Sequence, residues 1–166
     1  MRQLRARLSP QLTRWRREME VLERRQFSEP SRMIAVSRMV RDQIGARYEV
    51  DRSQIAVIHN GVDTDRFSPA RLAALRGAAR QQWALHGAPV FLLVANNFHL
   101  KGVATAIGAL ARLRREMPDA QLAVAGSGDA AAYRRLAEAR GVGRSVIFLG
   151  YVGKIEEACA AADVAI

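Results

Sequence analysis

The residues best suited to chemistry lie between Asn96 and Gly102, where a lysine and a glycine precede a helical pattern. Lys101 supplies a positive charge, and a helix that starts after Gly102 supplies unpaired backbone N–H groups with partial positive charge. This combination suits a phosphate or diphosphate. The structural alternative is a solvated loop lysine without a ligand, and the residues alone leave both open.

Two further glycine-containing segments follow apolar runs. Gly126-Ser127-Gly128 precedes Asp129 and, with the alanine at 131, matches the G-x-G-x-x-A pattern of dinucleotide-binding loops. The match is weak, because no acidic residue ends the following strand to bind a ribose. A tight turn with Asp129 as helix N-cap explains the same residues. Gly150-Tyr151-Val152 offers close backbone approach and an aromatic ring that would either lie beside a nucleobase or pack structurally.

The histidine and cysteine content argues against metal or nucleophilic chemistry. His59, His86 and His99 have neither the mutual spacing nor the acidic neighbours of a metal site or a catalytic triad. The single Cys159 excludes an intrachain disulfide and a multi-cysteine zinc site. These residues therefore predict no metal site. We also expect no cofactor.

These segments need a scaffold of alternating strands and helices. Apolar runs at 90–95, 121–125, 146–149 and from 164 onward are typical of buried parallel strands, and the patterns at 103–116, 130–140 and 155–162 predict helices between them. The alternation predicts an α/β protein with a parallel, doubly wound, Rossmann-like sheet. Ligands of such sheets bind beyond the carboxyl ends of the strands, which is where the three segments lie.

The first third of the chain has a different organisation. Residues 2–25 show an arginine-rich amphipathic pattern, which Ser9-Pro10 divides into two helices. Strands are predicted at 33–36 and 54–59, with a helix at 38–47 between them and an Asn60-Gly61 turn after the second. Residues 66–87 are predicted to be helical and connecting.

The charge balance predicts an anionic partner. The 166 residues include 26 Lys and Arg against 16 Asp and Glu, a net charge of +10, and all the basic residues except Lys101 and Lys154 are arginines. A phosphorylated small molecule, a nucleic acid or an acidic membrane surface would suit this charge. Nucleic acid is disfavoured, because no aromatic residues are interleaved with the arginines. The basic helical segment packs on its own domain or contacts an anionic membrane surface.

The chain shows no secretion or membrane-spanning pattern. No apolar stretch has the roughly 18 to 20 residues that a spanning helix needs, and the basic N-terminus lacks the apolar core of a signal peptide. A cytoplasmic location is expected, with peripheral attachment to the inner face of the cytoplasmic membrane as the alternative.

Several short motifs, in their order and spacing, resemble the retaining glycosyltransferases of family 4, which have the two-domain GT-B fold. The branch that adds glucose to the lipopolysaccharide core is the most similar. The resemblance implies that residues 1–62 are the C-terminal remnant of the acceptor domain, 63–87 an interdomain linker and helix, and 88–166 a truncated nucleotide-sugar-binding domain. The motifs are I-A-V-S at 34–37, V-I-H-N-G-V-D at 57–63 with R-F at 66–67, L-K-G at 100–102, A-G-S-G at 125–128, F-L-G at 148–150 and A-A-D-V at 161–164.

The resemblance also implies an activity. A sugar, expected to be glucose, would pass with retention from a nucleotide sugar such as UDP-glucose to a lipopolysaccharide-core or other glycolipid acceptor. Arg66 and Lys101 would bind the donor diphosphate without a metal ion, and the nucleobase would contact the backbone of Gly150, Tyr151 and Val152. The other donor-loop positions are Asn97, His99, Gly102, Gly126, Ser127 and Gly128.

The sequence departs from the family in ways that leave alternatives. Leu100 and Asn97 stand where relatives have arginines, although His99 would compensate in part. No position corresponds to the family's catalytic residues or paired glutamates, so we expect the chain alone to be inactive. A non-catalytic nucleotide- or nucleic-acid-binding module and a GT-B sugar-phosphate epimerase or synthase are the alternative functions.

Overall fold

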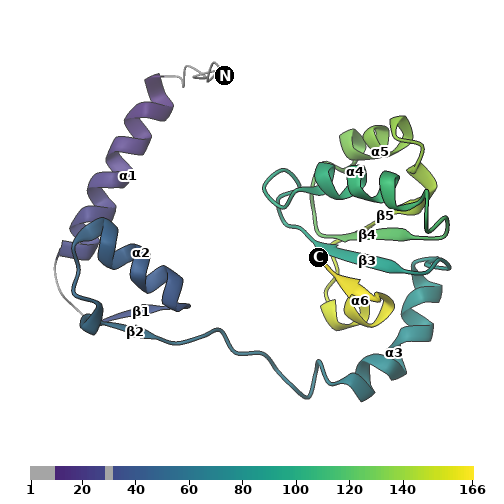
Figure 1. The fold of residues 1–166 in the computed structure, drawn as a ribbon, viewed down its shortest axis with the longest axis horizontal. Helices are drawn as coiled ribbons and strands as arrows, with labels where there is room; N and C mark the ends of the chain where they lie inside the picture. The colour runs from purple at the N-terminus through teal and green to yellow at the C-terminus, as the bar shows by residue number, and fades with distance from the viewer. Residues whose placement is uncertain (1–9, 29–31) are drawn as a thin grey trace. The chain divides into compact units, whose positions relative to one another are not determined.

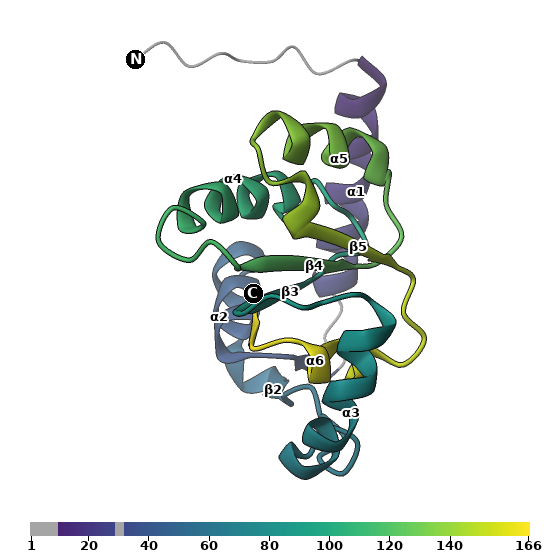
Figure 2. The same cartoon turned by 90° about the vertical axis from the view of Figure 1, so that its right-hand side faces the viewer.

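The structure, a computed structural model, describes residues 10–28 and 32–166 and divides the chain into two compact units, Met1–Gly61 and Val62–Ile166. Residues 2–9 of the predicted basic helical segment lie outside the described residues. Figure 1 shows the elements of each unit, and Figure 2 shows the same elements turned by 90°.

The first unit is a small parallel strand pair with two helices. Its elements are α1 (Pro10–Ser28), β1 (Met33–Ala35), α2 (Arg38–Tyr48) and β2 (Ile55–Val57), with Met33 opposite Ile55 in the strand register. Ser37 begins α2, because its hydroxyl accepts a hydrogen bond from the Val40 N–H at 3.2 Å. These strands and α2 confirm the elements predicted for this part of the chain.

Helix α1 meets α2 near its C-terminal end. The ring of Phe27 stacks on that of Tyr48 at 4.4 Å, and the Tyr48 hydroxyl donates to Glu23 at 2.6 Å. The middle of the apolar stripe of α1 is exposed within the described residues: the exposed fractions are 58% for Trp15, 37% for Met19 and 58% for Leu22. Within the described residues, α1 therefore packs on its own unit through its C-terminal end, and the middle of its apolar stripe stays exposed.

The second unit is a parallel sheet with helices on both faces. The strands β3 (Val90–Val94), β4 (Gln121–Ala125), β5 (Val146–Gly150) and β6 (Val164–Ala165) are arranged in the order β5-β4-β3-β6. Helices α4 (Val103–Leu113) and α5 (Ala130–Ala139) cover one face, and α3 (Pro69–Gln82) and α6 (Ile155–Ala161) cover the other (Figures 1 and 2). This arrangement confirms the predicted doubly wound α/β sheet.

Strand β4 shows how the sequence builds the two core layers. Leu122 and Val124 point to the side of α4 and α5, whereas Ala123 and Ala125 point to the side of α3 and α6. All four are buried, and each large apolar side chain that is buried contributes roughly 1.5–3 kcal/mol. The alanines allow α6, with its own buried Ala158 and Ala161, to approach the sheet closely.

One helix occupies part of a segment predicted to be helical and connecting, and another is shorter than predicted. The helix predicted within 66–87 is α3, which begins at Pro69 after the N-cap Ser68 and ends at Gln82, before Ala84 with a φ of 51°. The helix predicted for 103–116 ends at Leu113 and continues only as turns. Helix α3, predicted as part of an interdomain linker, lies in the second unit and packs against α6.

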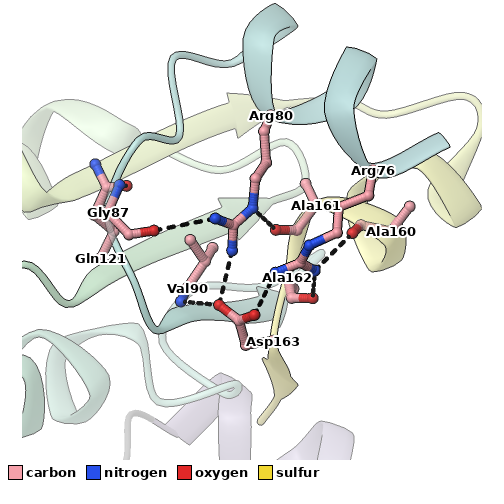
Figure 3. Close-up of polar contacts among 9 residues, drawn as sticks. All are labelled: Arg76, Arg80, Gly87, Val90, Gln121, Ala160, Ala161, Ala162 and Asp163. Atoms are coloured by element: carbon pink, nitrogen blue, oxygen red, sulfur yellow. Dashed lines mark hydrogen bonds and ion pairs between the residues drawn. The ribbon is translucent and has the colours of Figure 1, made fainter. Parts of the chain in front are cut away.

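A cluster of polar contacts joins α3, α6, β3 and β6 (Figure 3). The Asp163 carboxylate accepts a hydrogen bond from the Val90 N–H at 2.7 Å and one from the Arg80 guanidinium at 2.8 Å, and it also pairs with Arg76. The two arginines further donate to the carbonyls of residues 160–162. Carbonyls at the end of a helix lack partners within it, so these arginines complete the hydrogen bonding of α6.

Candidate functional site

The three predicted loops lie next to each other at the carboxyl ends of β3, β4 and β5. The Ala95 N–H donates to the Ala125 carbonyl at 2.8 Å, and the Gly126 N–H donates to the Gly150 carbonyl at 2.7 Å. The sheet register therefore continues into the first residues of the loops. It brings together the start of each segment that the sequence analysis selected.

Gly126 and Gly128 have packing roles in this structure. Gly126 has a φ of 135°, and a Cβ there would lie 1.9 Å from the Ala95 carbonyl oxygen. A Cβ on Gly128 would lie 2.7 Å from the ring of Phe98. Protein atoms therefore fill the space that side chains at these positions would need. Ser127 between them is exposed, and Asp129 caps α5 as predicted, accepting from the Ala131 N–H at 3.1 Å.

The loop that carries Lys101 is held by its own backbone and by Phe98. The Asn97 side chain accepts from the Leu100 N–H at 3.0 Å, and Gly102, at a φ of 70°, precedes α4. Phe98 is buried against the rings of Tyr133 and Phe148. Lys101 and His99 are exposed on this anchored turn, and within residues 10–28 and 32–166 the Lys101 ammonium has no ion-pair partner. Lys101 is thus an accessible cation on an anchored turn at the start of a helix.

Arg66 is held in place by three contacts. Its N–H donates to the Asp63 carboxylate at 2.9 Å, and its guanidinium lies 5.4 Å from the centroid of the Phe67 ring. The same guanidinium donates to Glu156 Oε2 at 2.6 Å. This hydrogen bond lowers the pKa of Glu156 and raises that of Arg66, so both groups are ionised at neutral pH. Arg66 has a carboxylate partner that the sequence analysis did not identify.

A hollow of about 390 Å³ adjoins the predicted nucleobase segment. Tyr151 and Val152 line it, and Tyr151 is 83% exposed. Trp83, which follows α3, also lines this hollow. The sequence analysis missed it, because no local pattern places the end of α3 beside the loop after β5. At this hollow the Nζ atom of Lys154 lies 3.7 Å from Oε1 of Glu157. The full lining is Gln82, Trp83, Leu149, Tyr151, Val152, Gly153, Lys154 and Glu157.

A larger hollow of about 530 Å³ lies elsewhere in the second unit. Its lining includes Phe91 and Leu122, from the beginnings of their strands, and Leu113 from the end of α4. It is therefore at the opposite end of the sheet from the three loops, and its lining is mostly apolar, with Arg112 and Glu116 as its charged residues. We place the candidate site at the loops.

Among residues 10–28 and 32–166, no three His, Cys, Asp or Glu side chains are grouped so that they could hold a metal ion. No helix within the same residues combines the length and apolar character needed to cross a bilayer.

Sequence comparisons identify related families and proteins. A profile of the family described as "Glycosyl transferases group 1" matches residues 76–166, and one of "Glycosyltransferase Family 4" matches residues 3–66. A GDP-mannose-dependent alpha-(1-6)-phosphatidylinositol monomannoside mannosyltransferase of Mycolicibacterium smegmatis is 38% identical over 89 residues, which are 53% of this chain and 23% of that protein. A phosphatidyl-myo-inositol mannosyltransferase of Mycobacterium tuberculosis is 32% identical over 125 residues, 74% of this chain and 30% of that protein. The chain thus spans less than a third of these relatives.

Structural comparison confirms the GT-B fold that the sequence resemblance implied. The crystal structure of WaaG, a glycosyltransferase involved in lipopolysaccharide biosynthesis, matches with a TM-score of 0.81 and 24% identity over 97% of this chain and 45% of WaaG. Anabaena HepE in complex with UDP-glucose matches with a TM-score of 0.66 and 23% identity over 81% of this chain and 37% of HepE. At these identities the similarity concerns the fold.

Proposed function

The chain belongs to the "Glycosyl transferases group 1" family, and on that premise we propose that its second unit binds the nucleoside diphosphate sugar from which a glycosyltransferase takes a hexose. The sugar would pass, with retention, to a glycolipid acceptor. The observation that carries this proposal is the junction of three loops at the carboxyl ends of the strands, with the exposed Lys101 on an anchored turn before α4.

The proposed chemistry is electrostatic stabilisation of the leaving group. A nucleoside diphosphate gains negative charge as its bond to the sugar breaks. Lys101, Arg66 and the first-turn N–H groups of α4 that follow Val103, whose own N–H donates to the Phe98 carbonyl at 3.0 Å, would stabilise this charge. No metal ion is required in the proposal. His99 and Ser127, both exposed, would lie beside the phosphates or the sugar. Asn97 and Gly102 would act through the backbone of their turn.

The nucleobase is proposed to lie at the hollow beside Gly150, Tyr151 and Val152. A volume of about 390 Å³ is within the range of small-molecule sites, and Trp83 and Tyr151 give it aromatic walls. UDP-glucose is the first donor candidate, supported by the fold shared with HepE, which was crystallised with UDP-glucose. GDP-mannose is the second, because the 38% identical relative is described as GDP-mannose-dependent.

We further propose that the acceptor is a glycolipid reached at the inner face of the cytoplasmic membrane. The names of WaaG and of the mannosyltransferases refer to lipopolysaccharide and to phosphatidylinositol lipids. In the described part of α1, the apolar Trp15 and Leu22 are exposed, as are Arg14 and Arg17. Such a helix suits contact with an anionic bilayer surface. If the donor is UDP-glucose, the proposed acceptor is the lipopolysaccharide core. If the donor is GDP-mannose, the proposed acceptor is a phosphatidylinositol lipid.

Calorimetric titration with UDP, UDP-glucose, GDP and GDP-mannose tests the proposed donor site. We expect one nucleotide pair to bind, and Lys101→Ala to weaken that binding by about tenfold or more, since a hydrogen bond to a charged group contributes roughly 1.5–3 kcal/mol. Arg115→Ala is the matched control, because it removes an exposed positive charge beyond the far end of α4. Absence of binding by the folded chain, or equal losses in both variants, would contradict the proposed site.

A further inference from the structure

Glu156 is a buried carboxylate placed against an arginine from a distant part of the chain. It lies in the first turn of α6, only 5% of its surface is exposed, and its Oε2 accepts from Arg66 Nη2 at 2.6 Å. Arg66 lies before α3, 90 residues earlier. A buried carboxylate is costly unless it is paired and hydrogen-bonded, so this contact restrains both side chains.

The contacts of Arg66 leave part of its side chain accessible. The Asp63 carboxylate accepts from the Arg66 backbone N–H, and the ring of Phe67 lies under the guanidinium. Glu156 accepts a hydrogen bond from Nη2. The side chain nevertheless keeps 40% of its surface exposed. A guanidinium has five N–H donors in a rigid plane, so further donors stay available in a direction that Glu156 helps to set.

We propose that Glu156 is a positioning residue, whose carboxylate holds the Arg66 guanidinium in the orientation that meets the diphosphate of the donor. This inference rests on the proposed function, because it assumes that Arg66 binds a nucleoside diphosphate. It adds a residue on α6, the helix that follows the proposed nucleobase segment, so the base and the diphosphate sites share one structural support.

Glu156 could either position Arg66 for the diphosphate or compete with the diphosphate for Arg66. The geometry favours positioning. If Glu156 only neutralised Arg66, its removal would tighten anion binding. An unrestrained arginine, however, must lose rotamer freedom when a ligand binds, and ordering one such side chain reduces affinity by a factor of roughly 2 to 10. Because Glu156 is buried and attached to a helix, it imposes this order before the ligand arrives.

The experiment measures binding of UDP and GDP by calorimetry to the full 166-residue chain and to four variants: Glu156→Leu, Glu156→Gln, Arg66→Ala and the double variant Arg66→Ala/Glu156→Leu. For the nucleotide that the wild type binds, we expect about fivefold weaker binding in Glu156→Leu. Glu156→Gln should bind nearly as the wild type does, because its amide oxygen still accepts from Arg66. The double variant should bind no more weakly than Arg66→Ala.

Two controls separate positioning from other effects. Glu116→Leu removes an exposed carboxylate and so makes the same change in net charge. Thermal unfolding of each variant separates loss of binding from loss of folding, and the rescue by glutamine does not depend on the leucine variant alone. A purely structural role of Glu156 would weaken binding equally with and without Arg66.

The outcomes distinguish this inference from the proposed function. Wild-type binding with unchanged or tighter binding in Glu156→Leu would overturn the positioning role alone. Additive losses in the double variant would overturn it too. If the folded wild type binds neither nucleotide, the proposed function is contradicted, and the inference is overturned with it.

Discussion

Replacing Asp163 by alanine should destabilise the second unit by about 3 kcal/mol. The Val90 N–H, which belongs to a residue with no exposed surface, loses its acceptor, and an unsatisfied buried donor costs about 1–3 kcal/mol. The ion pairs with Arg76 and Arg80 involve side chains that are 37% and 21% exposed, so each adds only about 0.5–1 kcal/mol. Both arginines keep carbonyl acceptors at the end of α6, which limits the loss.

Urea unfolding followed by Trp83 fluorescence measures this change. The chain has two tryptophans, so a Trp15→Phe background leaves Trp83 as the reporter of the second unit. With a slope of about 2 kcal/mol per molar urea, the midpoint should fall by about 1.5 M. Asp163→Asn should cost less, because its amide oxygen can still accept from the Val90 N–H. A shift for Asp163→Ala no larger than that of the control Glu116→Gln, about 0.5 kcal/mol or less, would refute the reasoning.

Further predictions concern pH and the loop glycines. Burial raises the pKa of Asp163, but the Val90 N–H and the arginine at 76 lower it more, and the hydrogen bond from Arg66, with the nearby charge of Arg71, lowers the pKa of Glu156. Because both folded-state pKa values lie below the ordinary values of about 3.9 and 4.3, stability should be full above about pH 5 and fall as pH drops through the folded values. Urea midpoints between pH 7 and 3 measure this loss, and Asp163→Asn should make the midpoint fall less over that pH range. An equal fall of the midpoint in the variant and the wild type would contradict the prediction. Gly126→Ala should destabilise the unit by more than about 3 kcal/mol, because its Cβ would meet the Ala95 carbonyl at 1.9 Å. Gly150→Ala, with a φ of 71° and open space around it, should cost only about 1–2 kcal/mol, and equal urea midpoints for the two variants would contradict the packing explanation.

The alternation of strands and helices could be predicted because it is written in local periodicity. The apolar run at 90–95 and the patterned segment from 103 correspond to β3 and α4, since each buries a face that its own residues define. The common position of the three loops followed from the parallel direction of the strands, because the carboxyl ends of parallel strands lie at the same end of the sheet. Helix ends were less predictable: α3 ends before Ala84, which has a positive φ, and α4 ends at Leu113, before the predicted bound of 116.

The contacts that fix the candidate site could not be predicted in the same way. Glu156 approaches Arg66 only because α3 and α6 pack side by side, and no spacing within either segment indicates this contact. The role of Gly128 depends on Phe98, from a different loop. The sequence pattern selected Gly126 and Gly128 as part of a G-x-G-x-x-A match. Whether ligand or protein occupies the space beside them is decided by tertiary packing.

The distribution of the two basic residue types has a practical consequence. Lys101 is exposed in the loop before α4, and Lys154, with 74% of its side chain exposed, lines the hollow beside Tyr151. These are the only two lysines in the sequence. The other 24 of the 26 Lys and Arg residues are arginines, which amine-directed reagents leave unmodified. Apart from the terminal amine, covalent acylation of this chain therefore labels only its candidate donor site. The extent of labelling at each lysine, read by mass spectrometry, would map which part of that site a bound nucleotide shields.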